Sequence, residues 1–172
     1  MDLAAHLRTV PDFPKPGILF YDISTLLAHP AAWKECVSRL ARLVQPYKPD
    51  VLIGIESRGF LTAAPLALEL DLGFVMVRKA GKLPGSVIKH SYSLEYGEDT
   101  IEILDSIIEP GQRIVVLDDL LATGGTMSAT IDLCRKVGGE VCAGICIVEL
   151  PDLQGRQKID VPVESLLTFS GG

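Results

Sequence analysis

The stretch from Ile114 to Met127 limits the possible folds of this chain more than any other part of the sequence. Four consecutive apolar residues, Ile114 to Leu117, fit a buried parallel strand, because such a strand is covered on both faces. The carboxylates Asp118 and Asp119 then end the apolar run. Adjacent side chains on a strand point to opposite faces, so both can be polar only if the strand ends at a rim of the sheet. We expect a ligand at that rim.

A turn of small residues follows the two carboxylates. It consists of Ala122, Thr123, Gly124, Gly125 and Thr126, and apolar residues at helical spacing continue from there to Val137. Glycines let the backbone approach a bound group, and the free amides at the start of a helix attract an anion such as phosphate. An ordinary connection between a strand and a helix is the alternative. Carboxylates repel a phosphate, so their presence favours a ligand with hydroxyl groups or a metal beside its phosphate, as in a sugar phosphate.

Two other phosphate-binding motifs are absent from the sequence. It contains neither Gly-x-x-x-x-Gly-Lys-[Ser/Thr] nor Gly-x-Gly-x-x-Gly. The stretch instead resembles the phosphoribosyl pyrophosphate signature of the type I phosphoribosyltransferases. This resemblance implies an α/β fold with a central, mostly parallel sheet flanked by helices, a small hood and a flexible lid. Residues 1–172 would form a single domain of this kind.

A second strand, turn and helix pattern runs from Val51 to Leu70. The apolar residues Val51–Ile55 precede a polar turn that begins with Glu56, Ser57 and Arg58. One interpretation is a charge pair at a helix entry, worth a few tenths of a kcal/mol. By the resemblance, Ser57 and Arg58 bind pyrophosphate, and the Glu56–Ser57 bond is the place where the family often has a cis peptide.

A third predicted strand, Gly73–Val77, leads into a basic stretch. Residues 72–94 contain four cations and no carboxylate, the cations being Arg78, Lys79, Lys82 and Lys89. A solvated basic loop is one reading, and a cationic clamp for a leaving pyrophosphate is the sharper one. The resemblance assigns Arg78, Lys79 and Lys82 to this clamp. It also predicts a flexible lid at about residues 80–96, in which Glu95 manages a proton of the purine and Tyr96 closes over the site.

The N-terminal region contains a proline-rich segment. Asp2–Val10 is expected to form a short helix, which must stop at Pro11 because three prolines follow within six residues. A surface arm is one interpretation of the segment. It also resembles the Phe-Pro-x-Pro-Gly-[Ile/Val]-x-Phe-x-Asp-Ile hood of the adenine-specific phosphoribosyltransferases. The hood would cover about residues 11–25, and the main chain at Leu19 and Tyr21 would bind adenine. Tyr21 replaces an arginine that is common there.

Composition limits the partners and the location of the protein. A formal net charge of −6 argues against a dedicated nucleic-acid binder. The longest apolar runs are too short to cross a bilayer and no signal peptide opens the chain, so a cytoplasmic location without membrane contact is expected. The four cysteines lack metal-ligand spacing, which favours reduced thiols in the core.

The resemblance implies a complete activity. The chain would transfer the 5-phosphoribosyl group from phosphoribosyl pyrophosphate to adenine, giving AMP and pyrophosphate, with Mg²⁺ carried by the substrate near Asp118 and Asp119. Catalytic roles fall to Glu95, Asp118, Asp119 and Arg58. The phosphoribosyl group and its 5'-phosphate would be held by Asp118, Asp119, Ala122, Thr123, Gly124, Gly125 and Thr126. A homodimer is implied as well. Two alternatives stay open: a phosphoribosyltransferase for hypoxanthine or xanthine, and a regulatory protein that kept the fold without the chemistry.

Overall fold

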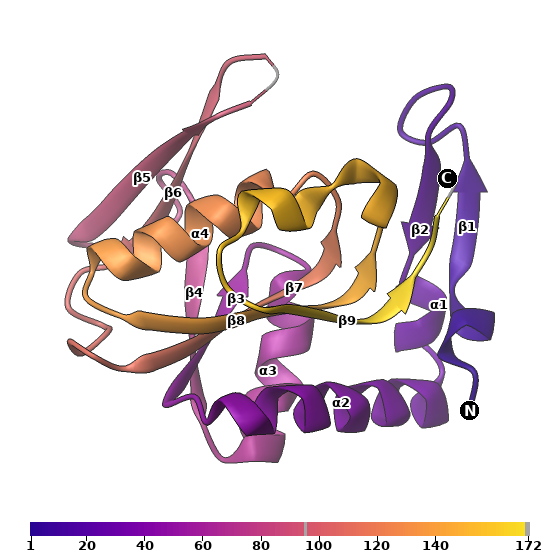
Figure 1. Cartoon of the computed structure of the whole chain (residues 1–172), viewed down its shortest axis with the longest axis horizontal. Coiled ribbons are helices and arrows are strands. Elements are labelled where there is room, and N and C mark those ends of the chain that lie inside the picture. The colour runs from indigo at the N-terminus through magenta and orange to yellow at the C-terminus, as the bar shows by residue number, and fades with distance from the viewer. Residues whose placement is uncertain (95, 171–172) are drawn as a thin grey trace.

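The computed structural model describes residues 1–94 and 96–170. Its main sheet has seven strands in the order β5-β6-β4-β3-β7-β8-β9 (Figure 1). Their bounds are β3 Val51–Ile55, β4 Gly73–Lys79, β5 Val87–Ser93, β6 Glu98–Leu104, β7 Arg113–Leu121, β8 Glu140–Glu149 and β9 Val163–Thr168. The five strands from β4 to β9 in this order pair in parallel, whereas β6 pairs antiparallel with both β4 and β5. The expected mostly parallel sheet is confirmed.

Helices cover both faces of this sheet. α2 (Pro30–Val44) and α3 (Gly59–Leu70) lie on one face, and α4 (Gly125–Lys136) lies on the other (Figure 1). The central strand β7 serves both layers, because Ile114 and Val116 pack with the residues of α4 while Val115 and Leu117 pack with those of α2 and α3. All four side chains are fully buried. This double burial explains the unbroken apolar run, and each such side chain stabilises the fold by about 1.5–3 kcal/mol.

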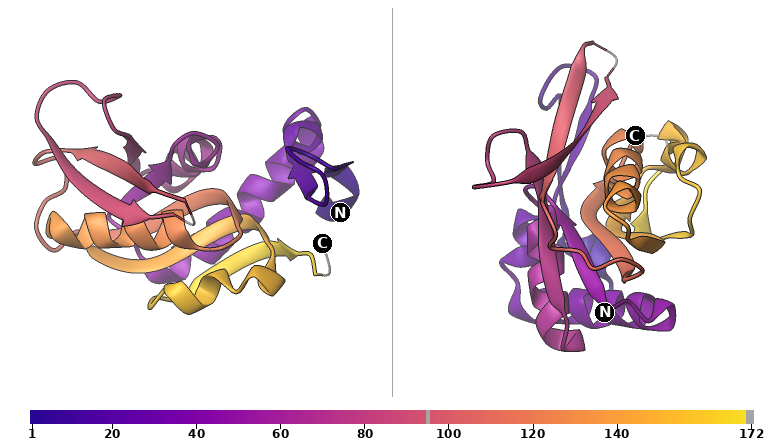
Figure 2. Two further views of the ribbon diagram at one scale, coloured as in Figure 1. Left: turned by 90° about the horizontal axis from the view of Figure 1, so that it is seen from above. Right: turned by 90° about the vertical axis from the view of Figure 1, so that its left-hand side faces the viewer.

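The N-terminal helix prediction was wrong. Leu3–His6 forms only one 3-10 turn, η1, and the chain then enters β1 (Arg8–Pro11), which pairs antiparallel with β2 (Leu19–Asp22) in a separate sheet. The strand-favouring residues Thr9 and Val10 find partners in β2 that a local pattern cannot reveal. The short helix α1 (Ser24–Leu27) follows. The β1–β2 and β5–β6 hairpins rise from the same side of the molecule, at its two ends (Figures 1 and 2).

The end of β7 also differs from the expectation. The strand does not stop at the carboxylates but continues through them to Leu121. β3 accompanies β7 only as far as the pair of Gly54 and Leu117, whereas β8 accompanies it to its last residue. Asp118 and Asp119 are therefore beyond the end of one neighbouring strand while the other still supports them. This overhang forms the rim at which the polar loops collect.

Short 3-10 turns complete the chain. They are η2 (Gln45–Tyr47), η3 (Pro151–Leu153) and η4 (Gly155–Lys158). All four cysteines are unpaired thiols, and burial raises the pKa of Cys36 and Cys134 to about 12. In the part of the chain that the structure describes, no helix combines the length and the hydropathy that a bilayer crossing requires.

Candidate active site

Three polar loops meet at the carboxyl ends of β4, β3 and β7, which are neighbours in the sheet. Together they enclose a cavity of about 500 Å³. Its lining residues are Glu56, Ser57, Arg58, Lys79, Asp118, Asp119, Leu120 and Thr126. The Glu56–Ser57 peptide bond in the first of these loops is cis. Residues predicted separately for the ribose, the phosphate and the pyrophosphate thus share one cleft, in the place where open α/β sheets bind their ligands.

The two adjacent aspartates differ in their surroundings. Asp119 is 5% exposed, and its Oδ2 pairs with Arg58 Nε at 3.0 Å. Asp118 accepts a hydrogen bond from the Asp119 backbone amide at 2.8 Å. Burial raises the pKa of the Asp118 carboxyl well above its usual range, and the charge of Asp119 raises it further. One member of the pair is therefore a carboxylate with a cation beside it, and the other holds a proton more readily.

Gly59 brings α3 close to these aspartates. A Cβ atom at this position would lie 2.8 Å from the Leu117 carbonyl oxygen and 3.3 Å from Asp118 Oδ1. A side chain would have to displace the backbone of β7, so glycine allows the first turn of α3 to pack directly against the strand. Arg58, the residue before Gly59, is held within reach of Asp119 by this packing.

The glycine-rich turn forms a second, smaller cavity of about 110 Å³ at the start of α4. Asp118 and residues 120–127 line it. Gly124 is the N-cap of α4 and has a φ angle of 85°, a left-handed conformation that favours glycine. The first turn of α4 carries no acidic residue. Free amides and the positive end of the helix dipole therefore face the cavity, which suits an anion.

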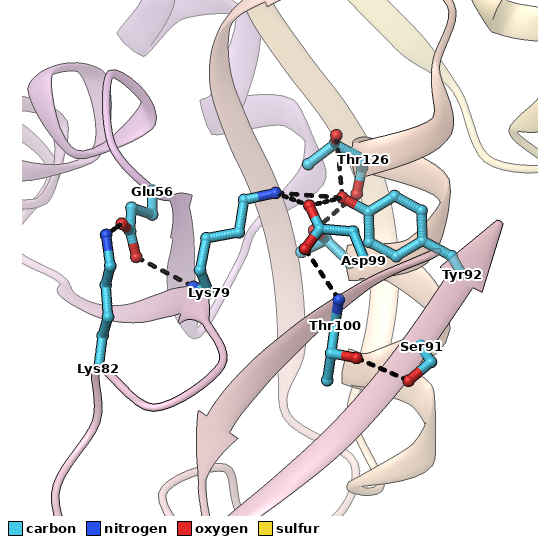
Figure 3. A network of polar contacts seen from close by, with 9 residues as sticks. Glu56, Lys79, Lys82, Ser91, Tyr92, Asp99, Thr100 and Thr126 are labelled. Atoms are coloured by element: carbon cyan, nitrogen blue, oxygen red, sulfur yellow. Dashed lines mark hydrogen bonds and ion pairs between the residues drawn. The ribbon is translucent and has the colours of Figure 1, made fainter. Parts of the chain in front are cut away.

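Glu56 pairs with two cations of the basic stretch, Arg78 and Lys82, and accepts a hydrogen bond from the Lys79 amide. Figure 3 shows its contacts with Lys79 and Lys82. Its Oε1 accepts hydrogen bonds from Arg78 Nε at 3.1 Å and from the Lys79 amide at 3.0 Å, and its Oε2 pairs with Lys82. Burial raises the pKa of Glu56, but the hydrogen bonds from Lys82, the Lys79 amide and Arg78 outweigh it and hold the pKa below its usual range. The sequence marked Glu56 only as a helix-entry charge, although it is the one carboxylate in two otherwise cationic loops.

A second polar network joins Lys79 to the phosphate loop, residues 122–126 (Figure 3). The Lys79 ammonium pairs with Asp99 on β6 and lies 3.5 Å from the Tyr92 hydroxyl on β5. That hydroxyl is 3.4 Å from Asp99 Oδ2 and 3.4 Å from Thr126 Oγ1. The hydrogen bond from Lys79 holds the pKa of Asp99 below its usual range. Sequence analysis missed Asp99, because it lies just beyond the carboxylate-free stretch and its partner is 20 residues away.

The predicted base-binding residues line a third cavity, of about 270 Å³, beside the hood. Its lining residues are Gly17, Ile18, Leu19, Tyr21, Leu150, Asp152, Leu153 and Phe169. The Tyr21 ring stacks on Phe169, with centroids 4.7 Å apart and planes 16° apart. The Leu150 amide donates to the Leu121 carbonyl at 3.0 Å, so this cavity adjoins the start of the phosphate loop.

Phe20, between the two predicted base-binding residues, connects β2 to the polar loop that follows β3. The Arg58 guanidinium lies 5.5 Å from the centroid of its ring. Alternation along β2 explains why Phe20 faces Arg58 while Tyr21 faces Phe169. Sequence analysis overlooked Phe20, although its place between Leu19 and Tyr21 could have suggested an aromatic surface for a base.

Of the two predicted lid residues Glu95 and Tyr96, the structure describes only Tyr96. Glu95 lies outside the residues that the structure describes. Tyr96, next to it at the tip of the β5–β6 hairpin, is 86% exposed. The flexibility of the lid and the roles of Glu95 and Tyr96 stay predictions.

Comparisons with known proteins agree with this site. The phosphoribosyl transferase domain family matches residues 22–166. Adenine phosphoribosyltransferase of Rhodospirillum centenum is 64% identical over 169 residues, covering 98% of this chain and 99% of that protein. The crystal structure of adenine phosphoribosyltransferase from Thermoanaerobacter pseudethanolicus superposes with a TM-score of 0.94 at 44% identity, over 97% of this chain and 98% of the other.

A third relative was solved with ligands. The Saccharomyces cerevisiae adenine phosphoribosyltransferase, complexed with an imino-altritol bisphosphate and adenine, has a TM-score of 0.90 at 38% identity over 96% of each chain. Fold, site and relatives together define a phosphoribosyltransferase class of enzyme. This chain therefore belongs to the phosphoribosyltransferase family and, within it, to the adenine phosphoribosyltransferases.

Proposed function

We propose that this protein transfers the 5-phosphoribosyl group of phosphoribosyl pyrophosphate to adenine in purine salvage, giving AMP and pyrophosphate. The observation that carries this proposal is the shared cleft. A cradle of amides, a pair of aspartates and a group of cations line connected cavities at one rim of the sheet, and an apolar cavity for a base adjoins them. These are the chemical groups that the two substrates require.

The phosphate loop and the aspartates would hold the donor by its ribose phosphate. Backbone amides at the start of α4 suit the 5'-phosphate, which fixes one end of the sugar. Asp118 and Asp119 beside the loop would accept hydrogen bonds from the ribose hydroxyls. The negative charge of Asp119 would also stabilise positive charge that develops on the sugar as the bond at C1 breaks.

The cations would receive the departing pyrophosphate. The residues proposed for this role are Ser57, Arg58, Arg78, Lys79 and Lys82. Every one of these cations is paired with a carboxylate of the protein: Arg58 with Asp119, Lys79 with Asp99, and Arg78 and Lys82 with Glu56. The carboxylate partners would keep the cations oriented before the substrate arrives. When pyrophosphate binds, it would take the place of these carboxylates.

The hood would bind the base. Main-chain groups at Leu19 and Tyr21 are the proposed readers of the adenine edge, because the Tyr21 side chain is committed to Phe169. The Phe20 ring beside Arg58 offers a flat apolar surface on which a purine can stack. Glu95 is the proposed partner for the proton that the purine exchanges during the reaction.

Three expectations complete the proposal: a magnesium requirement, a homodimer and a cytoplasmic location. Asp118 and Asp119 offer the hard oxygen atoms that Mg²⁺ prefers. Among residues 1–94 and 96–170, no group of three or more His, Cys, Asp or Glu side chains is suited to hold a metal. This donor set fits a metal ion held mainly by substrate oxygens, where it would offset the charge of the pyrophosphate.

An assay of pyrophosphate release tests the proposal. The protein is incubated with phosphoribosyl pyrophosphate, Mg²⁺ and one base at a time. Adenine should give turnover, whereas hypoxanthine and xanthine should give little. Preference for another base would reassign the substrate. A silent protein under all three conditions would favour the regulatory alternative. Omission of Mg²⁺ should abolish turnover, and sedimentation should show a dimer.

A further inference from the structure

The phosphate loop rests on a segment that lies about thirty residues further along the chain. η4 begins with Gly155, and a Cβ atom there would lie 2.5 Å from the Ala122 carbonyl oxygen and 3.2 Å from the Gly124 amide nitrogen. In return, a Cβ atom at Gly124 would collide with the Gly155 carbonyl oxygen. Backbone therefore packs on backbone with no room for a methyl group, and η4 is the floor of the phosphate loop.

Arg156 fastens this floor to the end of β8. Its Nε and Nη2 atoms donate to Glu149 Oε2 and Oε1 at 2.7 and 2.8 Å, and Ser165 Oγ donates to Oε1 at 2.9 Å. The Glu149 side chain is 4% exposed. A bidentate pair of this kind fixes direction as well as distance, because the guanidinium fork and the carboxylate must lie in one plane.

The position of Glu149 connects the pair to the active site from a second side. Glu149 is the register partner of Leu121, the last residue of β7 before the phosphate loop. The pair therefore ties together the strand that delivers the loop and the turn that supports it. Glu149 is buried, whereas the Arg156 side chain is 52% exposed. An ion pair that is open to solvent on one side contributes little net stability, so its benefit lies in orientation.

We propose that Glu149 and Arg156 are positioning residues for the 5'-phosphate. They hold Gly155 against Ala122 and Gly124, so that the amides of the loop keep the spacing that a phosphate needs. The proposal rests on the proposed function insofar as that function assigns the 5'-phosphate to this loop. The effect should be confined to the phosphate end of the substrate, because the proposed pyrophosphate cations lie elsewhere: Arg58 follows β3, Arg78 and Lys79 end β4, and Lys82 follows it.

Binding of ribose 5-phosphate, measured by calorimetry, tests the pair without turnover. Arg156→Gln should weaken this binding about tenfold or more, the effect expected when a binding group is misplaced by a fraction of an ångström to one ångström. The affinity of Arg156→Lys for ribose 5-phosphate should lie between those of Arg156→Gln and the wild type, since an ammonium keeps the charge but cannot bridge both carboxylate oxygens. Pyrophosphate binding should stay within about twofold of the wild type. Equal losses for both ligands would overturn the proposal.

Matched variants separate positioning from folding. Gly155→Ala adds one methyl group against the loop and should weaken ribose 5-phosphate binding, whereas Gly73→Ala adds the same group where nothing lies within 4 Å and should not. The double variant Glu149→Leu, Arg156→Met leaves no buried charge unpaired and should fold. We expect it to bind ribose 5-phosphate as weakly as Arg156→Gln. Wild-type affinity in the folded double variant would overturn the proposal.

The outcomes also distinguish this inference from the proposed function. Suppose that the wild-type protein binds ribose 5-phosphate but releases no pyrophosphate with adenine. This result contradicts the proposed function. The positioning role of Glu149 and Arg156 still holds if their variants weaken the binding of ribose 5-phosphate. Variants with unchanged affinity and an active wild type contradict the positioning alone. A wild-type protein that does not bind ribose 5-phosphate contradicts both.

Discussion

The unequal surroundings of Asp118 and Asp119 determine what each can do. Asp119 is almost fully buried yet has Arg58 beside it, so its charge is compensated in the absence of substrate. Among residues 1–94 and 96–170, no cation forms an ion pair with Asp118. Burial is the largest cause that raises its pKa, followed by the charge of Asp119. An adjacent pair in the sequence therefore gives two chemically different groups, because opposite faces of β7 meet different neighbours.

Asp119→Asn should lower kcat on the order of 100-fold, the loss typical of removing one preorganised electrostatic partner of a transition state. The amide keeps the shape of the side chain but cannot balance positive charge on the sugar. Steady-state kinetics with saturating adenine and phosphoribosyl pyrophosphate measure the change. Asp71→Asn is the control, since this exposed residue caps α3 in a left-handed conformation that asparagine also adopts. Full activity of the Asp119 variant would remove the ribose-holding role from this residue.

Asp99→Asn should strengthen inhibition by pyrophosphate. In the wild type, Asp99 pairs with Lys79, so a pyrophosphate that binds Lys79 as proposed would have to replace it. Without that carboxylate the inhibition constant should fall about two- to fivefold, the range that a partly exposed ion pair is worth. Asp105→Asn, on the same hairpin but bonded to serine hydroxyls, should leave the constant unchanged. Weaker inhibition in the Asp99 variant would mean that Asp99 positions Lys79 for the ligand instead of competing with it.

At the scale of elements, Asp22 links the parts of the hood. It stands at the end of β2, where its Oδ1 accepts the Ser24 amide at 2.9 Å at the start of α1 and its Oδ2 pairs with Arg8 on β1 at 2.6 Å. Hydrogen bonds from the side chain and amide of Ser24, and then from Arg8, lower the pKa of Asp22 to about 2 from an ordinary value of 3.8. One carboxylate thus joins two strands and a helix.

The stability of the hood should therefore depend on pH in a defined window. A carboxyl whose pKa is lower in the folded state stabilises that state above its unfolded pKa and loses this effect as the pH falls through its folded pKa. The difference in urea midpoint between the wild type and Asp22→Asn should be full above about pH 4 and should vanish towards about pH 2. Arg8→Gln should show part of the same dependence. A difference that does not change with pH would contradict this role for Asp22.

At the scale of the whole molecule, the charge distribution is uneven. The chain carries a net charge of −6, yet at the rim above β3 and β4 four cations face three carboxylate partners, Glu56, Asp99 and Asp119. Raising the ionic strength from about 0.01 to about 0.15 M shortens the screening length from about 30 to about 8 Å. The KM for phosphoribosyl pyrophosphate should rise severalfold over this range, while the KM for uncharged adenine should change little. Parallel changes in both constants would show that the basic rim does not attract the donor.

Sequence analysis predicted the elements that are built from local patterns. The short apolar run of Val51–Ile55 gave the bounds of β3, and the strand, turn and helix pattern up to Leu70 gave the end of α3, because the core on each face of the sheet dictates the spacing of these residues. β1 was missed because only its pairing with β2 makes it a strand. Local context decided the first two elements, and a distant partner decided the third.

The same distinction separates the predicted from the overlooked site residues. The phosphate loop and the aspartates are contiguous, so a motif reveals them. The partners of Lys79 and Lys82 lie 20 and 26 residues away in the sequence. The contact between Gly124 and Gly155 joins a segment that precedes β8 in the sequence to one that follows it. Such pairs have no signal within any window of the sequence, and only the fold shows that they meet.

The floor beneath the phosphate loop has a consequence for anyone who borrows this motif. A designer who grafts residues 118–127 onto the sheet of another scaffold would transfer the recognisable signature but not η4, on which the phosphate loop packs. The transplant would need residues 149–158 as well, together with a host strand order that puts them alongside. The portable unit of this enzyme is thus two separate pieces of chain.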